Sequence, residues 1–593
     1  MVLIQGESVM AWYDEAVFYH IYPLGLVGAP KNNDFNKEEI VHRLRDIYPW
    51  IGHIKKIGCN AIYIGPLFES EGHGYETRDY KRLDARLGDN EDLREFVKKC
   101  HEENIRVILD GVFNHTGRSF FAFQDIKKNR ENSQYKDWYC NVNFYGNNEY
   151  DDGFSYDNWG GYNLLAKLNQ RNPAVKEYIA DVIRFWVREF DIDGIRLDAA
   201  DVLDFEFMHM LRAVANEVKA DFYLMGEVIH GEYNRWVNEG TLHAVTNYHL
   251  HKALYSGMND HNFFEIAHTV KRLYGMGGNR TDGIRLYNFV DNHDVERIYT
   301  KLNNKAHFVP VHIMLYTLPG VPSIYYGSEF AIEGRKERNS DDSLRPAIRL
   351  EDYKSAYTDK PCTRLIASLG DIRKNYKALS YGDYREVILT NRQYVYSRNL
   401  ENEHIYIVLN NDDNACELSI PVEGDGEFTG VLTGKVYKAC EGRINVNVPA
   451  SLGDIIVIKE GNGRENKTAV AALIEAAIQN DGCDTKTVAA APIEAAIQND
   501  GCDTKTAAAA PIEAAIQNDG CDTKTADDIS EQSTQNEVYR VINKPYEDMT
   551  IEELQEAILE KMSKNGPITQ DMLRSVRENV YPDSLLNWVR SFR

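Results

Sequence analysis

Eight short apolar stretches with strand character alternate with amphipathic helical segments over roughly the first 375 of the chain's 593 residues. The intervening segments, such as residues 90–104 and 173–190, repeat apolar residues at helical spacing. Eight strands that each lead into a helix are typical of a closed parallel barrel. The sequence therefore predicts an α/β chain whose residues 1–375 form a catalytic (β/α)8 (TIM) barrel. The expected strands are residues 16–23, 59–67, 106–113, 194–199, 222–228, 244–250, 285–294 and 321–327.

Composition divides the rest of the chain into further parts. Residues 114–171, after the third strand, are too many for one helix and are rich in Asn, Asp, Tyr and Gly, so we expect an inserted domain there. Residues 376–460 alternate like strands, which predicts an antiparallel β-sandwich. Residues 461–527 carry three copies of IEAAIQNDGCDTKT with a period of 19 residues. Each copy is too short for a stable isolated helix, so we expect a linker, with a small solenoid as the alternative.

The last part of the chain, residues 528–593, is expected to be a small helical module. Its segment MTIEELQEAILEKM combines a capping box, formed by Thr550 and Glu553, with apolar residues at helical spacing. Two further short helical segments follow, and they contain Trp588 and Phe592. We expect these aromatic residues to form the module's own core. The alternative is a surface that docks a protein partner or self-associates.

Charge and composition exclude several classes of function. The net charge is −24, whereas nucleic-acid binding needs basic patches, so we expect no nucleic-acid partner. No apolar run approaches the 18 or so residues of a membrane span, and the first residues lack the pattern of a secretory signal. The nine cysteines are scattered, so we expect no disulfide framework. We therefore expect a cytoplasmic protein with no membrane partner.

Polar and charged side chains gather at the carboxyl ends of four predicted strands. Active sites of parallel barrels lie at this face, so we expect these side chains to form a catalytic site rather than structural caps. They are Asp110, Asn114 and His115 after the third strand, Arg196 and Asp198 on the fourth, Glu227 on the fifth, and Asp291, Asn292, His293 and Asp294 on the seventh.

Two carboxylates on neighbouring strands have the chemistry of glycoside hydrolysis. Retaining enzymes hold an ionised and a protonated carboxyl about 5–5.5 Å apart, and neighbouring strands are about 4.7–4.9 Å apart. Strand residues two apart share a face, so Arg196 is expected beside Asp198, where its charge would keep that carboxylate ionised. Glu227 has no cation adjacent on its strand and is expected to hold a proton. These residues predict Asp198 as nucleophile and Glu227 as acid/base.

Four motifs in this region resemble the signature regions of the alpha-amylase family, glycoside hydrolase family 13. They are DGVFNH, GIRLDAAD, GEV and FVDNHD, and they occur in the family's order. HGYETRDY, LLAKLN and LPGVPSIYYGSE are also similar to the family, and the resemblance covers about residues 12–460. It implies a catalytic barrel, an inserted domain B and a C-terminal β-sandwich.

Site roles are carried over by position. The resemblance implies that Asp198 is the nucleophile, Glu227 the acid/base and Asp294 a third carboxylate that stabilises the transition state. It implies contacts with substrate, or support for the site, from a further set of residues: Tyr75, His73, Asp110, His115, Arg196, His293 and Arg345.

The chain departs from the family directly after the nucleophile. Many members carry Ala-x-Lys-His there, and the histidine helps to bind calcium, whereas this chain has Ala199, Ala200, Asp201 and Val202. We therefore expect no required cofactor, with a structural calcium ion at Asn114 as the alternative.

The expected function is endo-acting, retaining hydrolysis of α-1,4-glucosidic bonds in starch, glycogen or maltooligosaccharides. The motif around the nucleophile and LLAKLN are similar to those of cyclomaltodextrinases and neopullulanases. An enzyme of that type, or a transglycosylating enzyme on short α-glucans, is therefore the alternative. A second alternative is a non-catalytic carbohydrate- or partner-binding relative, which the presence of all three carboxylates disfavours.

Overall fold

The computed structural model describes residues 11–35, 40–278, 280, 282–338, 340–401, 403–458 and 550–565, together with residues 576, 577, 585 and 589. The chain divides into two compact units, Met1–Asp484 and Thr485–Arg593. The 19-residue repeats, Trp588 and Phe592 lie outside the described residues.

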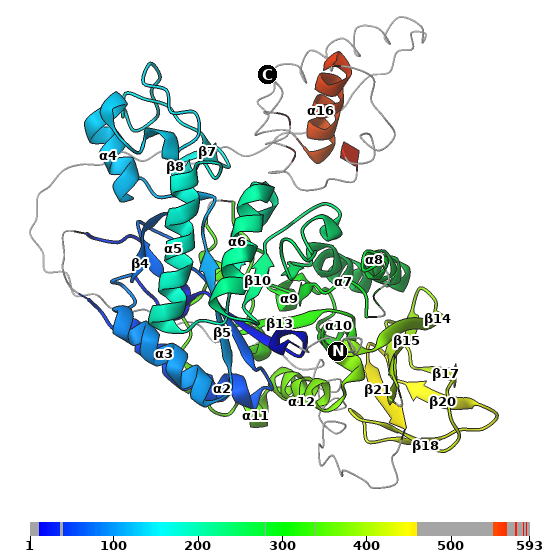
Figure 1. Ribbon diagram of the computed structural model, residues 1–593. Coiled ribbons are helices and arrows are strands. Elements are labelled where there is room, and N and C mark those ends of the chain that lie inside the picture. The colour runs from blue at the N-terminus through cyan, green and yellow to red at the C-terminus, as the bar shows by residue number, and fades with distance from the viewer. Residues whose placement is uncertain are drawn as a thin grey trace, which may run out of the picture. The chain divides into compact units, whose positions relative to one another are not determined.

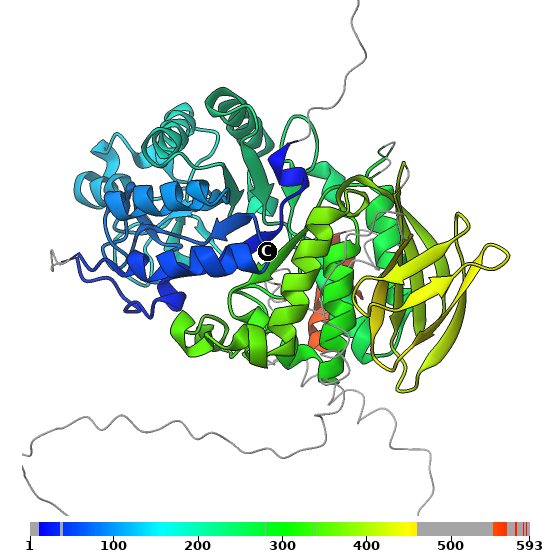
Figure 2. The same ribbon diagram turned by 90° about the horizontal axis from the view of Figure 1, so that it is seen from below.

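A closed barrel of eight parallel strands forms the centre of the first unit (Figures 1 and 2). The order around the sheet is β11-β10-β9-β5-β2-β1-β13-β12, and a parallel bridge between Thr246 and Tyr287 closes it. This order confirms the predicted TIM barrel. The strands are β1 (Phe18–Ile21), β2 (Ala61–Ile64), β5 (Arg106–Gly111), β9 (Gly194–Leu197), β10 (Tyr223–Gly226), β11 (Ala244–Val245), β12 (Tyr287–Phe289) and β13 (Val321–Tyr325).

Helices surround the barrel, and local sequence sets their limits. The side chain of Asp89 caps the first turn of α3 by accepting from the N–H groups of Glu91 and Asp92. α5 begins with Pro173 after the capping residue Asn172. The helices are α1 (Pro23–Leu26), α2 (Tyr48–Lys56), α3 (Asn90–Glu102), α5 (Pro173–Phe190), α6 (Phe205–Val218), α7 (Tyr248–Asn259), α8 (Phe263–Gly275), α9 (Ile298–Lys301), α10 (Phe308–Thr317), α11 (Ala356–Asp359), α12 (Pro361–Asn375) and α13 (Ala378–Tyr381).

The sixth barrel strand is much shorter than the sequence suggested. The stretch 244–250 was expected to be one strand, but β11 ends at Val245 and α7 begins at Tyr248. The cause is Asn247, whose side chain accepts from the N–H of Leu250 and so starts the helix. This early turn brings Tyr248 to the carboxyl end of the barrel.

The segment expected to be an inserted domain contains α4 (Phe121–Asn129) and a small antiparallel sheet of order β6-β8-β7. The strands are β6 (His115–Thr116), β7 (Asn158–Trp159) and β8 (Tyr162–Lys167). β6 directly follows the site residue Asn114, so this sheet continues from the rim of the barrel. A two-stranded sheet of β3 (Phe68–Ser70) and β4 (Thr77–Leu83) leads to the same rim.

Antiparallel strands follow the barrel and lie on a different side of it from α4, β7 and β8 (Figures 1 and 2). They form a six-stranded sheet and a two-stranded sheet around a shared apolar core. Buried Arg398 joins this part to the barrel by donating to the backbone carbonyl of Thr317 at 2.6 Å. The strands are β14 (Asp383–Leu389), β15 (Gln393–Leu400), β16 (Glu403–Asn410), β17 (Cys416–Pro421), β18 (Glu427–Gly430), β19 (Val436–Lys438), β20 (Arg443–Val448) and β21 (Gly453–Ile458).

The second unit contains α16 (Ile551–Asn565), as the apolar spacing predicts. The expected capping box is formed: the Thr550 N–H donates to Glu553 Oε2 at 2.7 Å, and the Glu553 N–H donates to Thr550 Oγ1 at 3.3 Å. Leu554 and Ile558 are buried in an apolar cluster with Val576, Leu585 and Val589. Over the described part of the chain, no helix combines the length and apolar character needed to span a membrane.

Candidate active site

Arg196 is the centre of the charged cluster at the carboxyl ends of the barrel strands. Its Nη1 atom lies 2.9 Å from Asp110 Oδ1 on β5 and 2.9 Å from Asp198 Oδ1 just beyond β9. Its Nη2 atom lies 2.8 Å from Glu227 Oε2, just beyond β10. Arg196 therefore contacts Asp198, as the strand pattern predicts. The guanidinium also contacts Glu227, which the sequence did not indicate, because the long side chain reaches from β9 to the end of the neighbouring strand.

Asp294 is held by a second cation. Arg345 Nη2 lies 2.8 Å from Asp294 Oδ1, and Arg345 Nε donates to the backbone carbonyl of His293 at 3.0 Å. His293 Nε2 lies 3.0 Å from Asp294 Oδ2. Arg345 also contacts Asp341, 3.0 Å from its Oδ2. The structure thus brings together Asp294, His293 and Arg345, although Arg345 is distant from both in sequence.

Aromatic side chains build one wall of the site. The Tyr75 hydroxyl donates to Asp110 Oδ2 at 3.2 Å and is 2.5 Å from His293 Nε2. The rings of Tyr75 and Tyr22 each stack nearly parallel to the ring of His293, with centroids 5.8 Å apart. Burial lowers the pKa of His293 to about 3, so this ring is neutral at physiological pH.

The remaining predicted residues lie around this wall. His73 is half exposed at the rim, and its Nε2 is 3.1 Å from Glu76 Oε1. His115 is buried, and burial lowers its pKa to about 3. Asp291 does not join the cluster, because it accepts from the Ser328 hydroxyl at 2.8 Å and from the Ile298 N–H at 2.9 Å.

The sequence did not indicate Tyr22 of the wall, nor two tyrosines that donate to the carboxyl groups of the site. The Tyr63 hydroxyl donates to Asp110 Oδ2 at 2.8 Å, and the Tyr248 hydroxyl donates to Glu227 Oε1 at 3.2 Å. Strand alternation could have indicated Tyr63, because it lies within the second predicted stretch, 59–67, and shares a face with Ala61. No local signal indicated Tyr248, because its place depends on the helix that begins there.

The electrostatics of the cluster favour a shared proton. Burial raises the pKa of Asp198 well above its ordinary value, the charge of Glu227 adds to that rise, and Arg196 opposes it. Burial also raises the pKa of Glu227, and the charge of Asp294 adds to the rise. Arg196 is one cation against three contacting carboxyl groups, so full ionisation is unfavourable. We expect the cluster to keep a proton near neutral pH.

Asp294 behaves differently from its neighbours. Burial acts to raise its pKa, but the charges of His293 and Arg345 outweigh burial and hold that pKa well below its usual range. His293 lowers the pKa of Asp294 because the imidazole ring is protonated, and so positively charged, at the low pH where Asp294 titrates. Asp294 is therefore ionised throughout the physiological range.

Among the described residues, the side-chain amide of Asn114 contacts Gln170 and His115. Its Oδ1 atom accepts from Gln170 Nε2 at 3.2 Å, and its Nδ2 atom is 3.3 Å from His115 Nδ1. Calcium takes six to eight oxygen ligands, whereas these contacts supply an amide N–H and an imidazole nitrogen. The described neighbours of Asn114 do not fit a calcium site, and no step below uses a metal.

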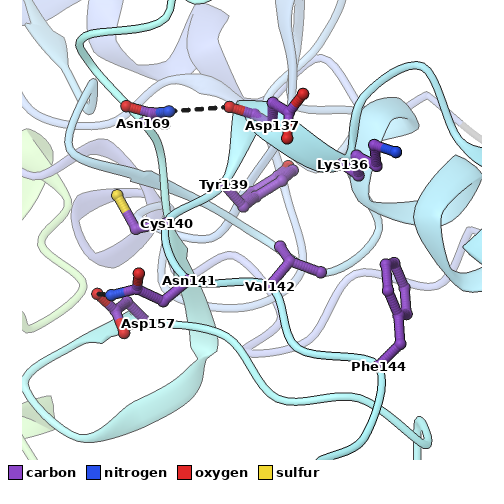
Figure 3. Close-up of a pocket in the computed structure, with 9 residues that line it drawn as sticks. All are labelled: Lys136, Asp137, Tyr139, Cys140, Asn141, Val142, Phe144, Asp157 and Asn169. Atoms are coloured by element: carbon purple, nitrogen blue, oxygen red, sulfur yellow. Dashed lines mark hydrogen bonds between the residues drawn. The ribbon is translucent and has the colours of Figure 1, made fainter. Parts of the chain in front are cut away.

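A separate hollow of about 420 Å³ lies within the inserted segment (Figure 3). It is lined by residues between Lys136 and Asn169. Asn169 donates to the backbone carbonyl of Asp137 at 3.0 Å, and Asn141 donates to Asp157 Oδ2 at 2.8 Å. These polar groups bond to one another, and none of the predicted site residues lines the hollow.

A parallel eight-stranded barrel that gathers carboxyl groups at the carboxyl ends of its strands is an arrangement that glycoside hydrolases use. The family model for the alpha-amylase catalytic domain matches residues 38–364. The chain belongs to the alpha-amylase family.

Relatives support the same assignment. A cyclomaltodextrinase from Bacillus sp is 31% identical over 428 residues, which cover 68% of this chain and 74% of that protein. Neopullulanase 2 from Thermoactinomyces vulgaris is 28% identical over 75% of this chain and 78% of that protein. A solved cyclomaltodextrinase structure superposes with a TM-score of 0.67 at 27% identity, covering 75% of this chain and 78% of its own.

Proposed function

We propose that this chain hydrolyses α-1,4-glucosidic bonds in short α-glucans, including cyclic ones, with retention of configuration. The names of its relatives support a cyclomaltodextrinase- or neopullulanase-type enzyme more than an endo-acting starch hydrolase, which belongs to the same reaction class. The observation that carries the proposal is the contact of one guanidinium, that of Arg196, with both Asp198 and Glu227.

In the proposed mechanism, Asp198 attacks the anomeric carbon while Glu227 protonates the leaving oxygen. A covalent glucosyl–enzyme ester forms, and the reducing-end fragment departs. Glu227, now ionised, takes a proton from water, which attacks the anomeric carbon and releases Asp198. Burial raises the pKa of both carboxyl groups, and that of Asp198 strongly. We assign the shared proton of the free enzyme to Glu227, because the nucleophile must be ionised in this mechanism and the charge of Asp294 favours the protonated form of Glu227.

The other side chains have supporting roles in this proposal. The ionised carboxylate of Asp294 stabilises positive charge that develops on the sugar in the transition state. Arg345 keeps Asp294 ionised and fixes its position. The neutral ring of His293 and the ring of Tyr75 form the wall against which the reacting sugar is placed.

Product analysis tests the proposal. Purified protein is incubated with maltotriose, β-cyclodextrin, pullulan and soluble starch, and the products are separated by chromatography. The proposal predicts faster cleavage of β-cyclodextrin and maltotriose than of starch. Starch cleaved much faster than β-cyclodextrin would favour the endo-acting alternative, and accumulation of longer oligosaccharides would favour transglycosylation. Asp198→Asn and Glu227→Gln proteins serve as inactive controls.

A further inference from the structure

An exposed aromatic hairpin stands beside the candidate active site. Trp159 closes β7 and Tyr162 opens β8, and the two are paired across the turn formed by Gly160 and Gly161. Both glycines have positive φ, 63° and 85°, as a tight two-residue hairpin turn requires. Residues paired across such a turn share one face of the hairpin, so both rings stand on the same side.

The hairpin is tied to the site through its other strand. β8 pairs with β6, and Lys167 lies opposite His115, a buried histidine that directly follows Asn114 at the end of the third barrel strand segment. The ring of Trp159 lies over the ring of His115, with centroids 6.0 Å apart and planes 36° apart. Trp159 therefore places an exposed aromatic ring beside His115, near the carboxyl ends of the barrel strands.

The base of the hairpin is fixed by hydrogen bonds. Asn158 Nδ2 donates to Asn163 Oδ1 at 2.7 Å, and the Tyr156 hydroxyl donates to the Asn163 backbone carbonyl at 2.7 Å. These bonds hold the strands at the level of the turn. The two aromatic side chains are thus presented by an ordered scaffold, which lowers the entropy lost when a ligand stacks on them.

Both rings leave a large area open to solvent. Trp159 is 39% exposed and Tyr162 is 65% exposed. Paired aromatic surface beside a catalytic cluster indicates a binding site, because isolated exposure of such rings would bring no gain in folding. A glucose ring presents apolar C–H faces that stack on an indole, while its hydroxyl groups stay in water.

We propose that Trp159 is a sugar-stacking residue that binds a glucose unit next to the one undergoing cleavage, with Tyr162 extending the same platform. This assignment rests on the proposed function, because it takes an α-glucan as substrate. It makes the hairpin a determinant of substrate length: a chain of several glucose units contacts it, whereas a single glucosyl group in the reacting position does not.

The test compares a long substrate with one that has a single sugar. Steady-state kinetics are measured with maltoheptaose and with α-glucosyl fluoride for wild type and for Trp159→Ala, Trp159→Phe and Tyr162→Ala. For maltoheptaose, Trp159→Ala is expected to raise KM about fivefold with little change in kcat, which corresponds to the loss of one stacking contact. Trp159→Phe is expected to recover most of this loss, and Tyr162→Ala to show a smaller rise. Activity on α-glucosyl fluoride is expected to stay within about twofold, since that substrate lacks the stacked sugar.

The matched control is Tyr145→Ala, which removes a fully exposed ring from the same inserted segment. It is expected to match wild type on both substrates. Equal losses on the two substrates for Trp159→Ala would overturn the assignment, because they would mean that the indole only supports His115. Unchanged kinetics on maltoheptaose would overturn it as well. A wild-type protein that cleaves neither substrate would contradict the proposed function itself, and this outcome is distinct from both.

Discussion

The Nη2 atom of Arg196 lies 2.8 Å from Oε2 of Glu227. The other terminal nitrogen of the same guanidinium contacts Asp198 and Asp110. The two proposed catalytic carboxyl groups therefore share one cation, and the ionisation of each depends on the other. In this proposal, the assignment of one group as nucleophile and the other as acid depends on their coupled ionisation. It does not depend on a cation that contacts Asp198 alone.

Replacing Arg196 by lysine should strongly reduce activity. The lysine ammonium is a point charge and does not form the planar fork that contacts two carboxylates at once. We expect kcat/KM for maltotriose to fall by about 100-fold, since one or two charge-assisted hydrogen bonds are lost. Arg349→Lys is the control, because that arginine is exposed and pairs with Asp352 outside the site. Thermal unfolding of each variant shows whether a loss of activity comes from a loss of folded protein. An Arg196→Lys protein that folds and keeps near-normal kcat/KM would show that the shared contact is unimportant.

Replacing Tyr248 by phenylalanine should shift the alkaline limb of the pH profile. The Tyr248 hydroxyl donates to Glu227 Oε1, and a hydrogen bond to the ionised carboxylate favours its charged form. Its loss raises the pKa of Glu227 further, so the acid form persists to higher pH. The measurement is the pH dependence of kcat/KM for wild type and variant, from about pH 4 to about pH 10. An alkaline limb that moves to lower pH would contradict the assignment of Glu227 as the acid.

Removing the second unit should leave the catalytic reaction intact. All the site residues belong to the unit Met1–Asp484, and the strands of the sandwich end with β21 at Ile458. A chain truncated after residue 460 lacks the second unit and also residues 461–484 of the first. It is expected to cleave maltotriose with wild-type kcat/KM. Loss of activity from a truncated protein with unchanged circular dichroism would mean that the C-terminal residues take part in the site. Docking of a partner by these residues stays a prediction from the sequence.

Chelation should not alter stability or activity. Asn114 is committed to Gln170 and His115, so removal of calcium leaves its contacts unchanged. We expect the same unfolding temperature and the same maltotriose activity in excess EDTA and in added calcium. An unfolding temperature that rises with calcium concentration would indicate an ion bound to the native state.

Replacing Asn114 by leucine is expected to lower the free energy of unfolding by about 1–3 kcal/mol, because it leaves the buried Gln170 amide without its acceptor.

The sequence predicted the barrel well because its signal is local and repeated. Most of these strands are buried on both faces and read as apolar runs, so the eight strands were found. The limits of the sixth and seventh were wrong, because the stretches 244–250 and 285–294 contain only the short strands β11 and β12. The motifs led to Arg196, Asp198 and Glu227 because strand ends converge at one face of a barrel. The sequence did not indicate the contacts between side chains that are distant in sequence and adjacent in the fold. Three contacts arise only when separate segments meet: Arg196 with Glu227, the hydroxyl of Tyr248 with Glu227, and Arg345 with Asp294.

The most direct test of the account is the identity of the residue that becomes covalently bound to substrate. The protein is incubated with 5-fluoro-α-glucosyl fluoride, digested, and analysed by peptide mass spectrometry. The account predicts a glucosyl adduct on the peptide that contains Asp198 and no adduct in Asp198→Asn protein. An adduct on Glu227 or Asp294, with Asp198 unmodified, would contradict the central claim.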